Sequence, residues 1–292
     1  MAAEGQSGQV AGSVVLVGFD GSREAAGAIA VGARVLPGVT ARVVTVWAPP
    51  GADQVLRRRI TRDARTLDEL SARIEQECAA AAEDVAADGA ALARAAGWRG
   101  EPATHRGFGD AGAVLARLAG EIPAAALVVG SRGLGGTAAL LGSVSDLAVH
   151  HSPVPVLVVP PLLRGERAAA ATGPVLVGHD GSAGAEHAQR TASALLPGRE
   201  QIAVHVTDDR RAGAEAAEPG PPDAVTVSAR GWGARAIADA LDAEAAARDA
   251  GVVVVGSRGR TALREVLLGS TAMAVLHRVH RPILVVPTPA ER

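Results

Sequence analysis

Apolar residues recur along the chain in short runs that are separated by amphipathic stretches. One run consists of four consecutive valines at 252–255 and ends at Gly256. A run this short and this rich in β-branched side chains predicts a strand buried on both faces, as in a parallel sheet. Because such strands alternate with helical patterns, the sequence predicts an α/β fold with helices on both faces of the sheet. The predicted strands are 13–17, 42–46, 103–105, 126–129, 156–159, 174–177, 202–206, 252–255 and 283–286; the predicted helices are 24–36, 53–97 with an interruption near Gly89, 110–119, 143–150 and 183–196.

The chain also contains an internal repeat. Residues 15–22 read V-L-V-G-F-D-G-S and residues 175–182 read V-L-V-G-H-D-G-S, while 155–160 and 282–287 read P-V-L-V-V-P and P-I-L-V-V-P. A duplication of this kind predicts two domains, at 13–160 and 174–288, joined by a linker at 161–173. The long helical stretch between Trp47 and Arg106 has no counterpart between Thr207 and Arg230. We therefore expect the second domain to lack one long helix.

Composition narrows the range of functions. A net charge of −2 and an aromatic content of 2% offer neither a basic surface nor a stacking platform for nucleic acid. All 29 basic residues are arginines, so a Walker-A lysine and a Schiff-base lysine are excluded. The single cysteine, Cys78, fits a reducing compartment. No signal-peptide pattern opens the chain and no apolar run approaches the ~20 residues of a membrane span, so we expect a cytoplasmic protein without membrane contact.

Glycine-rich loops follow the fourth predicted strand of each repeat and lead into a helix. Glycines let backbone N–H groups approach a phosphate, and a helix N-terminus favours negative charge. Asp20 and Asp180 end the first strand of each repeat, and loops at the ends of the first and fourth strands should meet where the strand order reverses. Ser143 and Ser270 are predicted helix N-caps, and Arg132 and Arg258 could contact phosphate. The alternative for all of these positions is purely structural: glycines that permit turns and serines that cap helices.

Taken together, the V-G-x-D-G-S opening, the G-x2-G-x9-G-S loop and the P-x-L-V-V ending resemble the universal stress protein family in its tandem two-domain form. The resemblance implies two Rossmann-like (adenine nucleotide alpha hydrolase-like) domains, each a five-stranded parallel sheet flanked by helices, with an adenine nucleotide bound at these loops. We expect this nucleotide to be ATP, with or without Mg²⁺. The resemblance also implies that backbone of the second strand, at Val46 and Val206, lines the adenine pocket. The nucleotide-binding residues expected in this way are Asp180, Val206, Gly256, Arg258, Gly259, Gly269, Ser270 and Thr271 in the second repeat, and Asp20, Val46, Gly130, Arg132, Gly133, Gly142, Ser143 and Val144 in the first.

The two loops differ in one respect. Nine residues separate Gly259 from Gly269, as the family pattern asks, but only eight separate Gly133 from Gly142. One residue fewer should redirect the N–H of the third glycine, so we expect the second site to be the better one.

The resemblance implies an ATP-binding protein that acts in stress response, and the residues favour binding over turnover, with no catalytic residues and no metal ligands expected in the chain. One alternative is an ATP-using enzyme of the same broad fold, such as an adenylyl transferase; the chain lacks the Ser-Gly-Gly-x-Asp and His-x-Gly-His motifs, although slow hydrolysis by a Mg²⁺-bound water stays open. Another alternative is a ligand-free interaction scaffold. For assembly, we expect strands 156–159 and 283–286 to pair within the chain as a pseudo-dimer, with a homodimer as a further option.

Overall fold

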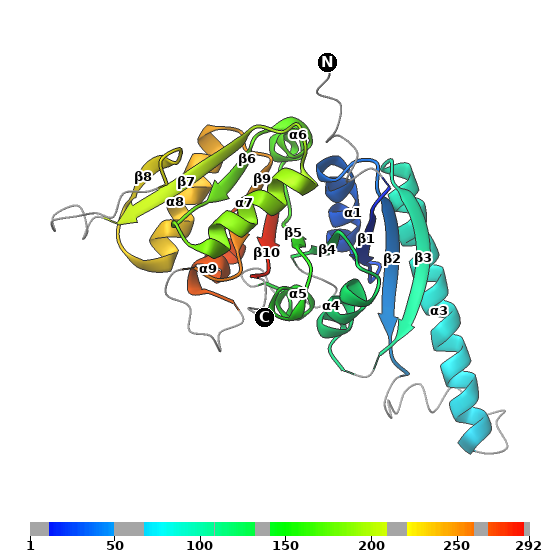
Figure 1. Ribbon diagram of the computed structural model, residues 1–292. Helices are drawn as coiled ribbons and strands as arrows, with labels where there is room; N and C mark the ends of the chain where they lie inside the picture. The colour runs from blue at the N-terminus through cyan, green and yellow to red at the C-terminus, as the bar shows by residue number, and fades with distance from the viewer. Residues whose placement is uncertain are drawn as a thin grey trace.

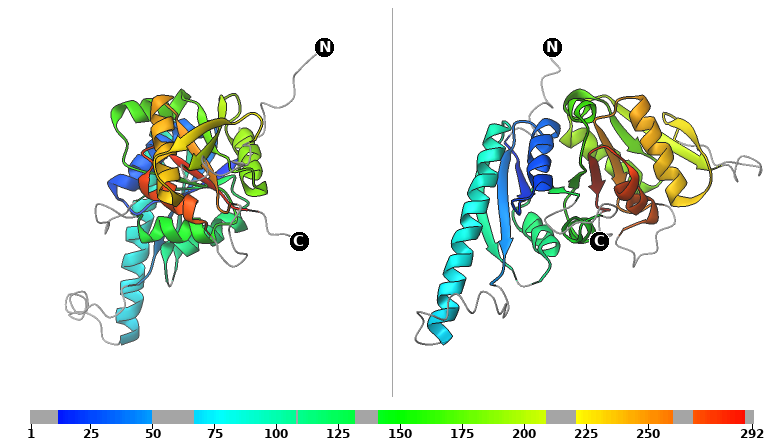
Figure 2. Two further views of the ribbon diagram at one scale, coloured as in Figure 1. Left: turned by 90° about the vertical axis from the view of Figure 1, so that its left-hand side faces the viewer. Right: turned by 180° about the vertical axis from the view of Figure 1, so that it is seen from behind.

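A computed structural model describes residues 12–49, 67–107, 109–131, 141–208, 221–259 and 268–288. All of its strands belong to a single ten-stranded sheet, in the order β3-β2-β1-β4-β5-β10-β9-β6-β7-β8 (Figure 1). Helices cover both faces of this sheet (Figure 2). Within these described ranges, no helix is long and apolar enough to cross a membrane.

Each repeat supplies half of the sheet. Strands β3-β2-β1-β4-β5 are mutually parallel, and so are β10-β9-β6-β7-β8, as the sequence predicted. The first half comprises β1 (Val14–Gly18), α1 (Arg23–Val35), β2 (Thr40–Trp47), α3 (Leu67–Ala95), β3 (Arg99–Arg106), α4 (Ala111–Glu121), β4 (Ala126–Gly130), α5 (Ser143–His151) and β5 (Val156–Val159). The second half comprises β6 (Val175–Gly178), α7 (Ala183–Leu195), β7 (Gln201–Asp208), β8 (Val225–Ala229), α8 (Gly233–Ala247), β9 (Val252–Gly256), α9 (Ser270–Arg278) and β10 (Ile283–Val286).

The two halves join through their fifth strands. Strands β5 and β10 pair antiparallel, and Leu157 lies opposite Leu284, its own counterpart in the repeat. A residue that faces its own equivalent marks a local twofold axis, so the chain forms the predicted pseudo-dimer. Apolar clusters on both faces of the sheet contain residues of both halves, and Leu157 and Leu284 belong to the same cluster.

Two predicted boundaries are wrong. Helix α3 continues through Gly89 without interruption, because the glycine allows the helix to lie against the rest of the core: a Cβ there would stand 2.6 Å from the Phe19 ring and 2.8 Å from a Val43 methyl group.

The predicted linker 161–173 contains a helix, α6 (Arg164–Thr172). Its Glu166 carboxylate accepts the Leu163 N–H at 2.6 Å and pairs with Arg281 of the second half at 3.1 Å. The two side chains are only 15% and 8% exposed, so this ion pair fastens α6 to the second half.

The described part of the second half contains no counterpart of α3. In the first half α3 covers the face of β2 that carries Ala41, Val43, Thr45 and Trp47. A constant offset of 160 positions places Gln201, Ala203, His205 and Thr207 on the matching face of β7. More polar residues therefore occupy the face where the helix is missing, which reduces the apolar surface that would otherwise be exposed.

Candidate functional site: the two strand-end crevices

The first and fourth strands of each half are neighbours, so the loops at their carboxyl ends lie side by side. Strand β1 pairs with β4, and β6 pairs with β9. The strand order reverses at these two places, which is where open α/β sheets form a ligand crevice. The structure therefore brings together the loops that the sequence analysis singled out in each half.

An Asp-Gly-Ser turn opens the first helix of each half. Oδ1 of Asp20 accepts the Ser22 N–H at 3.0 Å, and Oδ1 of Asp180 accepts the Ser182 N–H at the same distance. The serine hydroxyls then cap α1 and α7 by accepting N–H groups of the first turn. Gly181 has a φ of +79°, which explains the glycine between aspartate and serine. Oδ1 of each aspartate thus stabilises the turn that leads into the helix.

In the second crevice the other oxygen of Asp180 faces the glycine loop. A Cβ built on Gly259 would lie 2.6 Å from Oδ2 of Asp180, so the carboxylate rests directly over this glycine. Gly256 and Gly184 also lie in close contact, since a Cβ on Gly256 would be 2.9 Å from the Gly184 carbonyl oxygen. The G-S-R-G loop and the start of α7 are therefore packed backbone to backbone, with the aspartate at their edge. In the first half, Arg132 and Gly133 lie outside the described residues.

The loop spacing predicted different N–H directions for the third glycines, Gly142 and Gly269, but the structure shows the same direction in both halves. Gly142 donates its N–H to the Ser131 carbonyl at 2.7 Å, and Gly269 donates to the Ser257 carbonyl at the same distance. Both N–H groups point the same way and are already bonded, so the difference in spacing does not misaim Gly142. This part of our prediction is wrong, because a hydrogen bond across the loop sets the direction in both halves.

The predicted helix caps shift by one residue. Gly142 and Gly269 are the N-caps of α5 and α9, and Ser143 and Ser270 occupy the first helical position instead. No side chain caps either helix. The N–H groups of the first turn have no partner within the helix itself, and in α9 they belong to Ser270 and Thr271, with Ser143 and Val144 in the same places in α5.

The second strands place backbone at the crevices as well. Val44 accepts the Phe19 N–H at 3.0 Å, and Val204 accepts the His179 N–H at 2.9 Å. Backbone groups of residues two apart in a strand point to the same side. Val46 and Val206 therefore direct their N–H and C=O groups past the ends of β1 and β6, into the space that the crevice opens.

Arg258 has a buried polar atom with no partner. Its Nε is shielded from solvent and makes no hydrogen bond among the described residues. A buried, unsatisfied donor is costly. The sequence identified this arginine from its place in the loop, but the orphaned donor appears only in the structure.

The loop serines are the residues of the two crevices that the sequence analysis did not single out. Ser131 and Ser257 supply the carbonyls that hold the third glycines, and both side chains are buried. Oγ of Ser257 accepts the Thr288 N–H at 3.0 Å, which ties the loop to the end of β10. In the first half, the Ser145 hydroxyl lies 3.0 Å from the Ser131 carbonyl. The repeated G-S-R-G pattern contained this signal, because serine stands between the glycines in both copies.

Two histidines distinguish the second crevice from the first. His179 and His205 replace Phe19 and Thr45. Nδ1 of His179 accepts the Gly181 N–H at 3.1 Å, and Nδ1 of His205 lies 3.0 Å from the His179 carbonyl oxygen. Burial lowers the pKa of His179 below its ordinary value, an effect that the nearby Asp180 and Glu186 oppose and His205 reinforces. Burial therefore favours the neutral form of His179.

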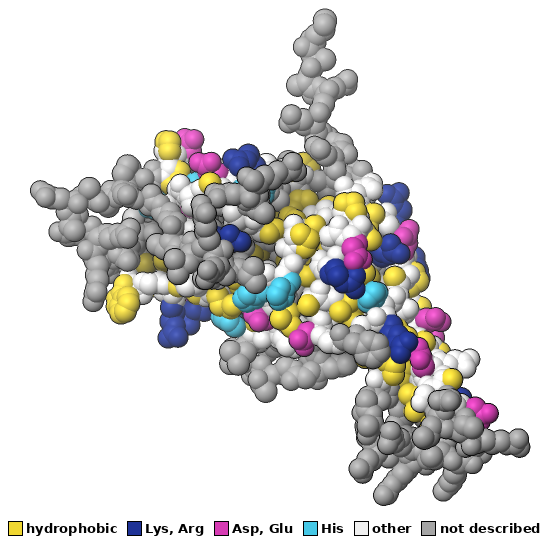
Figure 3. All heavy atoms as spheres, turned by 60° about the horizontal axis from the view of Figure 1, so that its bottom comes forward, with side chains coloured by type: hydrophobic (Ala, Val, Ile, Leu, Met, Phe, Trp, Pro, Cys, Tyr) yellow, Lys and Arg dark blue, Asp and Glu magenta, His cyan; other side chains and the backbone are white. Residues whose placement is uncertain are grey.

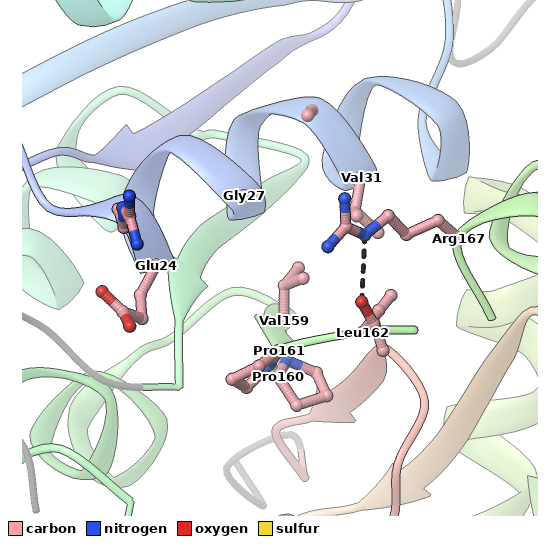
Figure 4. Close-up of a pocket in the computed structure, with 10 residues that line it drawn as sticks. Glu24, Gly27, Val31, Val159, Pro160, Pro161, Leu162 and Arg167 are labelled. Atoms are coloured by element: carbon pink, nitrogen blue, oxygen red, sulfur yellow. Dashed lines mark hydrogen bonds between the residues drawn. The ribbon is translucent and has the colours of Figure 1, made fainter. Parts of the chain in front are cut away.

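A separate cleft of about 280 Å³ lies between α1 and the residues that follow β5 (Figure 4). Gly27, Ala30 and Val31 of α1 form one wall, and the prolines after β5 form the other. Arg167 of α6 reaches across the opening and donates its Nε–H to the Leu162 carbonyl at 3.0 Å (Figure 4). This cleft falls just below the usual size of a small-molecule site. Among the described residues, no group of His, Cys, Asp and Glu side chains is arranged to hold a metal ion.

Comparison with known proteins identifies the family. The model of the universal stress protein family matches residues 13–160 and 209–287, which is more than half of the chain. The chain belongs to the universal stress protein family. A stretch of 38 residues is 53% identical to a universal stress protein of Synechocystis. This match covers 13% of the chain and only 35% of the length of that relative.

Solved structures show the same fold. The crystal structure of a universal stress protein from Archaeoglobus fulgidus DSM 4304 matches 94% of this chain and 98% of its own, with a TM-score of 0.64 at 22% identity. A functionally unknown protein from Pseudomonas aeruginosa PAO1 matches 96% of the chain and 94% of its own, with a TM-score of 0.53 at 14% identity. The universal stress protein fold, Rossmann-like and present in tandem, is therefore the fold of this chain.

Proposed function

We propose that the second crevice binds an adenine nucleotide and that this universal stress protein acts by binding rather than by turnover. The observation that carries the proposal is the convergence of Oδ2 of Asp180, the backbone of Gly259 and the start of α9 at one strand-end crevice. First-turn N–H groups and the orphaned Nε of Arg258 suit a polyphosphate. Backbone N–H and C=O groups of Val206 suit the edge of a purine, and Asp180 suits ribose hydroxyls.

The surface favours a small ligand over nucleic acid. Among the described residues on the face shown in Figure 3, basic and acidic side chains are interspersed, and no extended field of one sign is seen. The chain carries a net charge of −2 and is 2% aromatic, which leaves little to attract or stack a polynucleotide. A cytoplasmic location, which we also propose, would supply ATP to this site and keep Cys78 reduced.

Binding is tested by calorimetric titration of the purified protein with ATP, alongside mass spectrometry of small molecules that copurify. We expect saturable binding of ATP, with Asp180→Asn weakening it. Asn keeps an acceptor for the Ser182 N–H and removes the charge, so circular dichroism should stay unchanged. A protein that neither copurifies with a nucleotide nor binds ATP at about 1 mM would instead be an interaction scaffold.

Turnover is tested on the same preparation. No lysine is available to stabilise charge on a transferring phosphoryl group, so we expect hydrolysis of ATP to be slow or absent. Phosphate release with and without added Mg²⁺ measures it. A rate near the enzyme median of about 10 s⁻¹ would contradict binding without turnover and support the enzyme alternative.

A further inference from the structure

The two outer strands of the sheet are protected to different degrees. Strands β3 and β8 lie at opposite ends of the strand order, and each has a single neighbour in the sheet formed by the described residues (Figure 2). An outer strand presents unpaired N–H and C=O groups that can pair with another chain. Proteins that avoid such pairing place charges or proline on the exposed edge.

The edge of β3 is blocked. Val43 of β2 directs its backbone toward β3, where its register partner is Pro102. In a parallel pair, the residues on either side of the partner make the hydrogen bonds, so Pro102 itself faces outward. Proline has no N–H to donate at this position. Arg99, Glu101 and Arg106 add charge along the same strand, so β3 is a poor template for another strand.

Among the described residues, the edge of β8 carries no such block. Val204 directs its carbonyl toward β6, so the neighbouring His205 and Thr207 direct their backbones toward β8. Their register partners are Thr226 and Ser228, which by the same rule face outward. Strand β8 reads V-T-V-S-A and contains neither proline nor charge. The side chains of Thr226 and Ser228 are exposed to solvent, so both outward N–H groups belong to small, uncharged residues.

We propose that β8 is a homodimerisation edge, at which β8 pairs antiparallel with β8 of a second copy of this chain about a twofold axis at Val227. This register is self-complementary. Thr226 lies opposite Ser228 of the second copy as a hydrogen-bonded pair. By symmetry, Ser228 forms the same pair with Thr226 of the second copy. Val227 then faces Val227 of the second copy as a non-hydrogen-bonded pair, in which side chains approach most closely.

A second copy fits this edge better than a charged partner would. Self-pairing sets Thr against Ser on one face of the sheet and Val against Val on the other, with no like charges opposed. If β3 paired with β3 of a second copy, its charged residues would lie at the interface and Pro102 would leave one hydrogen bond without a donor. A pairing of five residues buries less surface than a permanent interface, so the dimer forms at high protein concentration and dissociates on dilution.

Sedimentation velocity over a range of concentrations tests the assembly. We expect the full chain to shift from monomer to dimer as its concentration rises, with a dissociation constant below about 1 mM. Thr226→Pro removes an outward donor without touching the bonds to β7, so this variant should stay monomeric at every concentration. Thr104→Pro places proline at the equivalent outward position of β3 and is the matched control, expected to dimerise as the parent does. Circular dichroism of all three checks that the fold is kept.

Disulfide crosslinking tests the register. In a Cys78→Ser background, Val227→Cys should form a dimer under mild oxidation, because Cα atoms of a non-hydrogen-bonded pair lie about 4.5 Å apart, within disulfide reach. Val225→Cys is the control: in this register its symmetry mate is displaced by about four residues, roughly 14 Å along the strand, and no crosslink forms. A parent that stays monomeric, a dimer that survives Thr226→Pro, or equal crosslinking at 225 and 227 would each overturn the proposal.

Discussion

At the scale of single residues, Gly269 offers the most direct test of the second crevice. Its φ of −73° suits any residue, and a Cβ there would make ordinary contacts of 3.4–3.8 Å with the Ser257–Gly259 loop. Neither backbone strain nor a steric clash therefore requires glycine at this position. The glycine leaves space at the mouth of the crevice, between the loop and the start of α9.

We predict that Gly269→Val weakens ATP binding by about tenfold or more, equivalent to about 1.4 kcal/mol, with little loss of stability. The valine methyl groups would occupy the space where a phosphate approaches the loop. Gly142→Val in the first half is the matched control and should remove less of the total binding. Calorimetric titration of both variants measures this, and the ranking is wrong if Gly142→Val abolishes binding while Gly269→Val leaves it intact.

His179 makes a second prediction at this scale, about pH. Burial lowers its pKa in the folded state, so between that value and the ordinary one of about 6.5 the unfolded chain binds more protons than the folded chain. The stabilisation is complete above the ordinary pKa and is lost as pH falls through the folded-state pKa. Protonation of Nδ1 would also remove the acceptor of the Gly181 N–H.

His179→Phe restores the residue that the first half carries at this position. We expect it to reduce the fall in Tm between about pH 7.5 and 5.5, since one of the histidines with a lowered pKa is gone. His187, whose pKa burial also lowers, stays in both proteins and accounts for part of the remaining slope. Thermal unfolding followed by circular dichroism measures the effect, and identical pH profiles would show that His179 contributes nothing.

At the scale of elements, Gly89 shows how packing overrides helix propensity. Replacing a helical glycine by alanine ordinarily stabilises by about 1 kcal/mol, and overpacking a core costs about 1–3 kcal/mol. A Cβ on Gly89 would be forced into the Phe19 ring, so we predict that Gly89→Ala lowers the free energy of unfolding.

Gly27 of α1 provides the control for that substitution. A Cβ there would meet open space, so Gly27→Ala should gain the helix propensity and stabilise the protein. Urea unfolding of the two variants gives the comparison. If both substitutions stabilised equally, the contact between α3 and Phe19 would not be tight enough to explain why the helix carries a glycine there.

At the scale of the whole molecule, the continuous sheet couples the two halves. Apolar clusters on both faces include residues from each repeat, and α6 is fastened to the second half through Arg281. We therefore predict a single unfolding transition in calorimetry, with equal calorimetric and van't Hoff enthalpies. Gly89→Ala should shift this transition without splitting it. Two resolved transitions would mean that each half unfolds on its own.

The sequence by itself determined the elements whose signals are local. Runs of valine and leucine identified the buried strands, and the repeated D-G-S and G-S-R-G motifs placed Asp180 and Gly259 at the ends of neighbouring strands. These inferences held because side-chain periodicity and glycine conformation act over a few residues. The pairing of the fifth strands within the chain was expected from the repeat and the family resemblance, and the structure adds its antiparallel direction and register.

Only the tertiary structure decided how distant segments meet. Gly89 lies inside a continuous helix that packs closely on Phe19, and Gly142 and Gly269 aim their N–H groups alike because a serine carbonyl across the loop receives each one. Similarly, the open edge of β8 and the closed edge of β3 follow from which residues the register turns outward. Contacts of this kind depend on partners far apart in the chain, and no local pattern encodes them.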